Sequence, residues 1–487
     1  MRKIFGAMML RISGGDGSMI HFIAEEMHAC RRQWLALGVF LAVAVCLLCL
    51  SIGFIAAGAP YADDLDFGLR DIGEEYISLG GMQLAFIAFG VLAIVPAVVS
   101  TSIAVDSPRI ARWQLAGASV RQSQGLYWCS LVIDAIIFSI LGGLVAWLLW
   151  PAYSSWALRV SFPSVDEMHE SISAIALPIG IATGIAVTAL AGAGSMRSIS
   201  HIDIATVVRD TGLSRTRHHP VRLLLGIAVA VGIITGYVAI SKQPSTISSD
   251  TLDGLMAAYW GCALGWLLAL ALCESTVVPL AVAVVSRLIP QSGGLGSFLA
   301  CGSARRRIRM STAMVTPICV AAGTVGAIMG LVRQIRNVSR ARGVSESELQ
   351  VTPAGQIVFE FMSPIILAAV AAFCIIVITG AQRKTDTALL MVAGVPRRAI
   401  IASGFVEAFV YSLVAAILTV AILEVNALAI GAALGAGPVP GAGYAGIDSS
   451  AFCIIAAGFA LLAILLVSIL ALQTQRDPLT IVRATDR

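Results

Sequence analysis

Long apolar blocks alternate with short polar segments along the whole of this 487-residue chain. A helix needs roughly 20 apolar residues to cross the hydrocarbon core of a bilayer. The pattern predicts ten membrane-spanning helices, at 34–57, 82–104, 125–150, 172–194, 221–240, 255–285, 310–332, 361–381, 399–425 and 450–472. The chain is therefore expected to be an all-α polytopic membrane protein. The sixth block is longer than a bilayer requires, so we expect that helix to tilt or to bend near Pro279.

The composition excludes a soluble globular protein. Hydrophobic residues make up 58% of the chain and charged residues 12%. A soluble fold of this length has too large a wetted surface for so few polar groups. The ten cysteines lie in or near the apolar blocks. We interpret them, including the closely spaced Cys46 and Cys49, as packed small hydrophobic residues, and we expect no metal site.

Basic residues are unevenly distributed between the two sets of connecting segments. Most of the 32 Lys and Arg residues fall in 1–33, 105–124, 195–222, 286–309, 382–398 and 473–487. Cytoplasmic loops carry an excess of Lys and Arg, so both termini are expected to be cytoplasmic. Residues 1–33 also place apolar side chains on one helical face, which predicts an amphipathic helix on the cytoplasmic leaflet. The opposite loops are short, and we expect no large domain there.

Two short patterns recur along the chain. An Ala-Gly pair at 116–117 follows the second block, and a second pair at 393–394 follows the eighth. The segment 203–209 after the fourth block resembles 477–483 after the tenth, at nearly the same offset. The similar offsets predict one duplicated four-helix unit.

The duplication suggests a division of the chain into four parts. These are an N-terminal segment (1–33), a first four-helix repeat (34–210), two connecting helices (221–286) and a second four-helix repeat (300–487). Two connecting helices return the chain to the same side of the membrane. The repeats are then parallel and related by a pseudo-twofold axis along the membrane normal.

The segment LAGASVRQ at 115–122, with its more degenerate copy VAGVPRR at 392–398, lies between two apolar helices in each half. This arrangement resembles the FtsX-like permease domain. That domain forms the membrane subunit of the FtsX/MacB class of ABC transporters, also called type VII. The ten-helix form resembles permeases of the BceB kind, but the large extracytoplasmic domain of that family is missing from this sequence. The resemblance implies a bacterial plasma membrane and a partner ATPase homodimer.

The sequence contains no ATP site of its own. A phosphate-binding loop requires glycines ahead of a Gly-Lys-Ser/Thr sequence. The chain has three lysines, and Lys384 precedes Thr385 without any glycine cradle. The chain itself is therefore not expected to be an enzyme or to hold a cofactor. ATP and Mg would bind to a separate ATPase, with two ATPase subunits for each copy of this chain. Membrane lipids and an extracytoplasmic protein are further expected partners, and nucleic acid is not.

The two recurring loops are the candidate contacts with that ATPase. We expect a short helix over 108–114, a tight turn at Gly117 and a new helix from near Val120. Arginines in these loops suit an acidic groove. An alternative is that they only follow the positive-inside rule. The candidate coupling residues are Arg109, Arg112, Ala116, Gly117, Arg121, Ala393, Gly394, Arg397 and Arg398.

Four acidic residues fall within predicted spans, where burial is expensive and usually functional. Glu424 lies near the end of its span, and the three candidates for a function are Asp134, Glu274 and Glu407. The resemblance implies that Glu407 matches an acid that family members often carry early in this helix. The alternative is a structural role, with each acid paired to a loop arginine or to a neighbouring hydroxyl.

The patterns leave three functions open. The first is a permease subunit that exports or extracts an amphipathic substrate, such as an antimicrobial peptide or a lipid. The second is mechanotransmission to an external cell-wall hydrolase or another surface partner. The third is an ion-driven secondary transporter, which would need facing carboxylates near the bilayer midplane.

Opposite charges also face each other across the predicted axis on the outer side. Acids follow the first helix, and arginines occupy the end of the seventh. One hypothesis is a salt-sensitive latch at the outer mouth; the other is that the arginines bind lipid headgroups and the acids are merely solvated. The latch residues would be Asp63, Asp64, Asp66, Arg336, Arg340 and Arg342.

Overall fold

The protein is described here by a computed structural model. It describes residues 25, 27–28, 30–62, 67–161, 175–196, 220–243, 249–289, 294–306, 308–343, 354–436, 439, 441, 443–444 and 446–475. Within these ranges every regular element is a helix, and no strand occurs. Ten of the described helices are long and apolar enough to cross a membrane. The prediction of an all-α multi-pass membrane protein is therefore confirmed.

The helices follow the ten predicted blocks, with one addition. Their bounds are α3 (Arg31–Gly58), α4 (Phe67–Leu115), α5 (Val120–Ser161), α6 (Ala176–Met196), α8 (Pro220–Ser241), α9 (Ser249–Leu288), α10 (Leu295–Arg306), α11 (Ile308–Ala341), α12 (Ala354–Val392), α13 (Arg397–Ala436) and α14 (Ser449–Thr474). The added helix is α10, in a segment that the sequence assigned to a loop. The recurring segments 203–209 and 477–483 and the predicted N-terminal amphipathic helix up to residue 24 lie outside the described residues.

Several helices are much longer than a membrane crossing. Helix α4 has 49 residues, about 73 Å at 1.5 Å per residue, against roughly 30 Å of hydrocarbon. It continues through both Pro96 and Pro108. The separate short helix expected over 108–114 is therefore wrong, because those residues form the last turns of α4. The helix thus extends past the bilayer at both of its ends.

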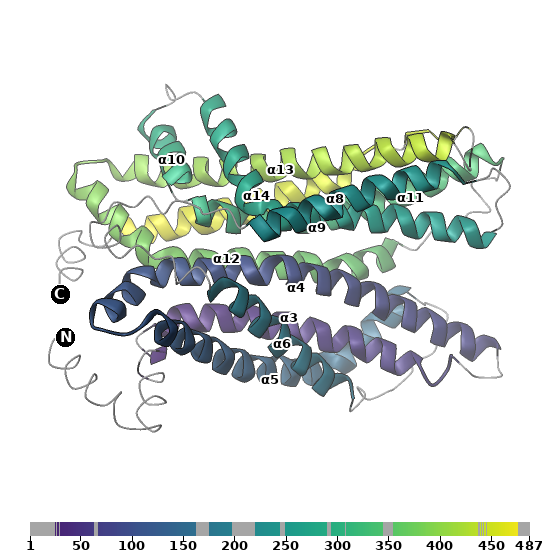
Figure 1. Cartoon of the computed structure of the whole chain (residues 1–487), viewed down its shortest axis with the longest axis horizontal. Helices are drawn as coiled ribbons and strands as arrows, with labels where there is room; N and C mark the ends of the chain where they lie inside the picture. Colours follow the sequence, from purple (N-terminus) through teal and green to yellow (C-terminus); the bar gives the residue numbers. More distant parts are fainter. Residues whose placement is uncertain are drawn as a thin grey trace.

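Most of the helix pairs in contact in the first half of the chain have a counterpart in the second half. Helix α3 packs on α4, α5 and α6, and α11 packs on α12, α13 and α14. In each group the third and fourth helices also pack together, and the second touches the fourth. Figure 1 shows the first group in purple and blue, and the second in green and yellow. The helices α4 and α12 lie side by side between them.

The central pair α4 and α12 runs parallel. A Cβ built at Gly90 of α4 would lie 2.8 Å from Leu367 Cδ2 of α12. Closer to the start of both helices, the Gln83 side chain donates to the Phe359 carbonyl oxygen at 3.3 Å. Both helices therefore end at the same end of the molecule, the left end in Figure 1. We call this the hairpin end, because the turns 115–120 and 392–397 lie there, and the other end the far end.

The connecting helices belong with the second half. Helices α8 and α9 pack on each other and on α13, and α9 also packs along α11. The short α10 packs mainly on the first turns of α13, where a Cβ at Gly296 would lie 3.1 Å from Ala402 Cβ. Large apolar side chains on the outward faces stay exposed, as expected where lipid is the solvent; examples are Leu148, Leu190 and Leu224.

Small residues bring the helices of the first half close together. A Cβ at Gly142 of α5 would lie 2.4 Å from the Ala42 carbonyl oxygen of α3. A Cβ at Gly180 of α6 would lie 2.4 Å from Cys49 Sγ. Membrane helices associate largely through such close packing, because burial from lipid supplies little driving force. Cys49 is fully buried and all ten cysteines are free thiols, as expected for packing residues.

Candidate functional site

The candidate site begins with the turn between α4 and α5. The Ala118 N–H donates to the Trp113 carbonyl and the Gly117 N–H donates to the Gln114 carbonyl, both at 3.0 Å. This pair of bonds is a Schellman motif, which satisfies the last carbonyls of a helix. Gly117 has a φ of 100°, which glycine adopts without a steric penalty. The tight turn expected at Gly117 is confirmed.

The next helix starts with a capping box. The Ser119 N–H donates to Gln122 Oε1 at 2.8 Å, and the Gln122 N–H donates to Ser119 Oγ at 3.3 Å. Such reciprocal bonds satisfy two of the free N–H groups at a helix start. The recurring sequence around 115–122 thus has a direct physical role, since it builds a tight helical hairpin.

The second hairpin has the same turn but a different helix start. The Val395 N–H donates to the Leu390 carbonyl and the Gly394 N–H to the Met391 carbonyl, both at 3.0 Å. Gly394 has a φ of 85°. Pro396 replaces the capping serine of the first copy, which is compatible with a helix start because proline has no N–H to satisfy. The degenerate second copy therefore preserves the turn.

Both hairpin tips expose apolar side chains beside arginines. Leu115 is 60% exposed, and Val392, which stands at the matching position, is 56% exposed. The exposed arginines at the tips are Arg112, Arg121, Arg397 and Arg398. Ala116 is partly buried and Ala393 exposed within the turns. Each tip therefore offers an apolar centre with a cationic border.

Arg109 lies below the first tip and differs from the other predicted coupling residues. Its guanidinium contacts Cys30 Sγ and lies 3.6 Å from Asp106 Oδ1. Its side chain is 31% exposed. We therefore assign Arg109 to the support of the hairpin rather than to its outer surface.

A buried polar cluster supports the first hairpin. The Gln33 amide of α3 donates to Asp106 Oδ2 at 2.7 Å and to Ser102 Oγ at 2.8 Å. The Ser102 hydroxyl is 2.8 Å from the Tyr127 hydroxyl of α5. The cluster ties α3, α4 and α5 together. Sequence reasoning missed Asp106, because it counted this residue as a loop acid beyond the span 82–104.

An ion pair supports the second hairpin. Both terminal nitrogens of Arg383 in α12 bind the Glu407 carboxylate of α13, at 2.8 and 2.9 Å. The Tyr411 hydroxyl donates to Glu407 Oε1 at 2.6 Å. Arg383 is 2% exposed and Glu407 is 3% exposed. The alternative raised for Glu407, pairing with an arginine and a hydroxyl, is confirmed. Arg383 and Asp106 precede their hairpin glycines by the same number of residues.

The other two intramembrane acids are not paired with each other. Glu274 accepts a hydrogen bond from the Thr316 hydroxyl at 2.8 Å, which links α9 to α11. Asp134 in α5 is fully buried, and neither of its carboxylate oxygens has a hydrogen-bond partner among the described residues. With Glu407 bound to Arg383, the three acids form no facing carboxylate pair in the described part of the chain.

The structure does not test the predicted latch at the far end. Asp63, Asp64 and Asp66 lie outside the described residues. Their proposed partners are exposed on the last turns of α11 and just beyond; they are Arg336, Arg340 and Arg342.

The neighbouring Arg333 binds within the second half instead. It pairs with Asp448 at 2.9 Å and donates to the Ile447 carbonyl at 2.8 Å. Asp448 also caps α14 by accepting from the Ser450 N–H. Partial burial acts to raise the pKa of Asp448, but the bonds from Ser450 and Arg333 hold that pKa below its ordinary value.

Aromatic side chains join the two halves toward the far end. Phe359 of α12 is fully buried, with its ring 5.7 Å from Phe54 and 5.1 Å from both Tyr153 and Trp156. All three neighbours belong to the first half. Sequence reasoning missed this contact, because its members are scattered over separate spans.

A reciprocal aromatic contact links α4 to the second half. The ring of Phe86, which is fully buried, lies 5.2 Å from Trp260 of α9 in an edge-to-face arrangement. The same ring lies 6.2 Å from Phe361 of α12. Each half therefore inserts one buried phenylalanine into the other. In this conformation aromatic packing holds the halves together.

Comparisons with known proteins give no family. No protein-family model matches the chain, and no curated protein matches it either.

Proposed function

We propose that the chain is the permease subunit of an ABC transporter of the FtsX/MacB class. It would couple ATP hydrolysis by a separate ATPase to the export or extraction of an amphipathic substrate, such as an antimicrobial peptide or a lipid. One observation carries this proposal. Two hairpins with identical turn hydrogen bonds project from the same end and expose an apolar centre bordered by arginines. Two equal docking elements suit the two subunits of an ATPase dimer.

The helix contacts support a duplicated membrane unit. Apart from the weak contact between α4 and α5, the pairs in contact within α3–α6 recur within α11–α14. Across the centre, α3 contacts α12 just as α11 contacts α4. A pseudo-twofold axis between α4 and α12 would exchange these two contacts. One chain would then supply both halves of the permease, with one copy for each ATPase dimer.

Each hairpin is placed to act as a lever. Helix α4 is continuous from the first turn to the aromatic contact at Phe86 near the far end. Helix α12 likewise connects the second turn to Phe359. The buried groups around Asp106 and Arg383 fix the hairpin ends to their neighbours. ATP and Mg would bind on the partner, and rotation of the hairpins would separate the aromatic contacts.

Charge supports a cytoplasmic position for the hairpin end, because both tips carry exposed arginines, as the positive-inside rule expects of cytoplasmic loops. We infer a bacterial plasma membrane with both termini cytoplasmic, since the class to which the permease is assigned works there.

Mechanotransmission is the second candidate, and one observation favours it. Helix α4 begins at Phe67, well before the predicted span at 82–104. This extension would project from the far end and would move a surface partner such as a cell-wall hydrolase. The described acids give no comparable support to an ion-driven secondary transporter, because Glu274 and Glu407 are held by a hydroxyl and an ion pair.

The test is isolation of the tagged chain from its native membrane, followed by mass measurement of the intact complex. We expect one copy of the chain with two copies of an ATPase. The variants Leu115→Asp and Val392→Asp should release the ATPase. The matched control Arg336→Asp, at the far end, should retain it. A complex with two copies of this chain, or no ATPase in the wild-type preparation, would contradict the proposal.

A further inference from the structure

A hydrogen-bonded cluster away from both hairpins joins the connecting helices to the second half. The Tyr237 hydroxyl of α8 donates to Asn426 Oδ1 of α13 at 2.7 Å. The same hydroxyl accepts from Trp266 Nε1 of α9 at 2.8 Å. Tyr259 of α9 also interacts with the Asn426 side chain. We call these four residues the Tyr237 cluster, because one tyrosine hydroxyl links three helices.

The Tyr237 cluster is buried in apolar surroundings. Asn426 is 1% exposed, and both tyrosines are buried beside Ile233 and Ile430. All three helices are long and apolar enough to cross the membrane. An amide in such a place costs free energy unless it is hydrogen-bonded. The Asn426 side chain is therefore stable only while Tyr237 stays beside it.

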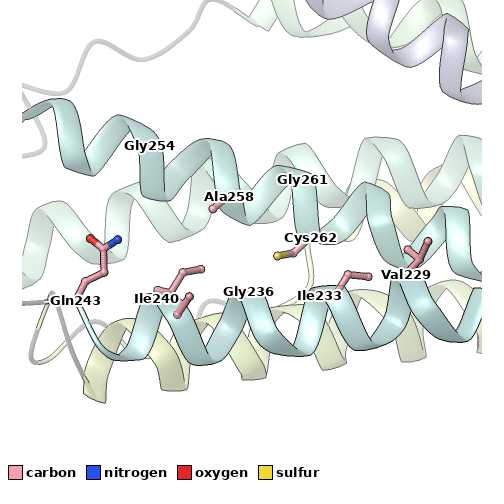
Figure 2. Close-up of a pocket in the computed structure, with 11 residues that line it drawn as sticks. Val229, Ile233, Gly236, Ile240, Gln243, Gly254, Ala258, Gly261 and Cys262 are labelled. Atoms are coloured by element: carbon pink, nitrogen blue, oxygen red, sulfur yellow. The ribbon is translucent and has the colours of Figure 1, made fainter.

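Apolar packing does not join the two connecting helices along their whole length. Figure 2 shows an apolar groove of about 730 Å³ between α8 and α9. A Cβ built at Gly236 of α8 would lie 3.8 Å from Cys262 Sγ of α9, and one built at Gly261 would meet nothing within 4 Å. Helices in lipid gain little from apolar contact alone, because the lipid chains are equally apolar. The hydrogen bonds of Tyr237, the residue after Gly236, supply a specific contact where the packing is open.

The first half has no counterpart of Asn426. The residue spacing that matches Gly117 to Gly394 also matches Leu149 of α5 to Asn426. Leu149 is 46% exposed. Both connecting helices pack on α13, whereas neither packs on α5 in the part of the chain that the structure describes. The polar residue thus occurs only in the helix that the connecting pair covers.

We propose that the Tyr237 cluster fixes the register of the connecting helices on α13, so that α8 and α9 move with the second half as one body. A single buried asparagine specifies the register of packed helices, because any other register leaves its amide unpaired. Movement of α8 along α13 would leave Asn426 and Trp266 without the Tyr237 hydroxyl. When the two halves separate, the boundary then runs between α9 and α4, where Trp260 contacts Phe86. The proposal concerns only how the helices are held together, and it does not depend on an ATPase or on a transported substrate.

The test is amide hydrogen exchange of the full-length protein in detergent micelles, mapped by mass spectrometry at increasing amounts of denaturing detergent. In the wild type, peptides from α8, α9 and α13 should share one dependence on the detergent, as parts of one cooperative unit do. Tyr237→Phe keeps the ring but removes both hydrogen bonds. Each such bond between membrane helices accounts for about a threefold change, so exchange in α8 should become about tenfold faster. Asn426→Leu, which leaves the bond from Trp266 in place, should speed it about threefold.

Tyr153→Phe is the matched control for the loss of a tyrosine hydroxyl. Tyr153 of α5 is partly buried, and its hydroxyl is hydrogen-bonded to Gln83 of α4 within the first half. This variant should speed exchange in α4 or α5 and leave α8 unchanged. Unchanged exchange in α8 of Tyr237→Phe would overturn the proposal, and so would an equal increase throughout α3 to α6. A wild-type α8 that opens separately from α13 would overturn it as well.

Discussion

The ion pair between Arg383 and Glu407 gives the sharpest prediction for the second hairpin. Glu407→Gln leaves the Arg383 guanidinium, which is 2% exposed, without a counter-charge. Removal of one partner from a buried ion pair costs about 3–5 kcal/mol, because the remaining charge stays desolvated. The two short bonds at 2.8 and 2.9 Å place this pair in that class.

The double variant separates the charge from the packing. Arg383→Met with Glu407→Leu removes both desolvation costs but leaves the buried Tyr411 hydroxyl without its Glu407 acceptor, so it should cost about 1–3 kcal/mol, less than either single variant. The coupling energy between the two positions should therefore be at least about 2 kcal/mol. Tyr411→Phe removes the hydroxyl that donates to Glu407 at 2.6 Å and should cost about 1.5–3 kcal/mol, the range for a bond to a charged group.

The assay is reversible unfolding of the purified protein by detergent titration, followed by tryptophan fluorescence. Glu424→Gln is the matched control, because Glu424 lies on the same helix and accepts from Tyr444 at the surface. It should cost less than about 1 kcal/mol. The reasoning is refuted if Glu407→Gln costs no more than this control, or if the double variant is as unstable as the single ones.

Four further predictions test the rest of the molecule. Gly117→Val or Gly394→Val should each cost about 1–2 kcal/mol of stability, because both turns need a positive φ. Each variant should also reduce transport-coupled ATPase activity. Full coupling in both variants would count against the hairpins as the ATPase contacts. Phe359→Ala should cost about 3–5 kcal/mol of stability and should speed amide hydrogen exchange at the start of α12. Unchanged exchange would show that the aromatic contact does not hold the two halves together there. Asp134→Asn should be neutral or stabilising in the same unfolding assay, since its carboxylate has no hydrogen-bond partner among the described residues; a large loss would reveal a missed partner. The pKa of Asp448 is lowered in the folded state, so its carboxylate contributes stability that is present above the unfolded pKa and is lost as pH falls through the folded pKa. Asp448→Asn should therefore reduce the fall in unfolding free energy at acid pH. An unchanged fall would exclude this carboxylate as its source.

The sequence was sufficient to predict those structural elements that depend only on residues near each other in the chain. Apolar blocks predict membrane helices because the bilayer sets their minimum length, and Gly117 predicts a tight turn because glycine tolerates a positive φ. Helix bounds were less accurate, because nothing in a hydropathy pattern ends a helix at the membrane surface. Helix α4 shows this by continuing through Pro108 to Leu115.

Contacts between distant segments could not be predicted in this way. In the sequence Asp106 looks like an ordinary loop acid. Only the structure shows that the Gln33 amide of α3 lies 2.7 Å from its Oδ2 atom. In the sequence Arg383 is likewise one basic residue among several. Only the structure shows that its guanidinium binds the Glu407 carboxylate of α13. The aromatic contact of Phe359 joins four residues from three separate helices. Single-sequence periodicity reports which face of a helix is apolar, but not which helix covers it.

The two hairpins share a turn, but the groups that support them are not interchangeable. Asp106 stands where the second half has Arg383, and Ser130 stands where it has Glu407. Asp106 is bound by the Gln33 amide and lies 3.6 Å from Arg109, so the charge at each support has its own partners. The first support rests largely on hydrogen bonds through Gln33, and the second on a buried ion pair. Loss of one charged partner is costlier in the second case. If both tips bind equal ATPase subunits, Glu407→Gln at the second support should therefore weaken coupling more than Gln33→Ala at the first.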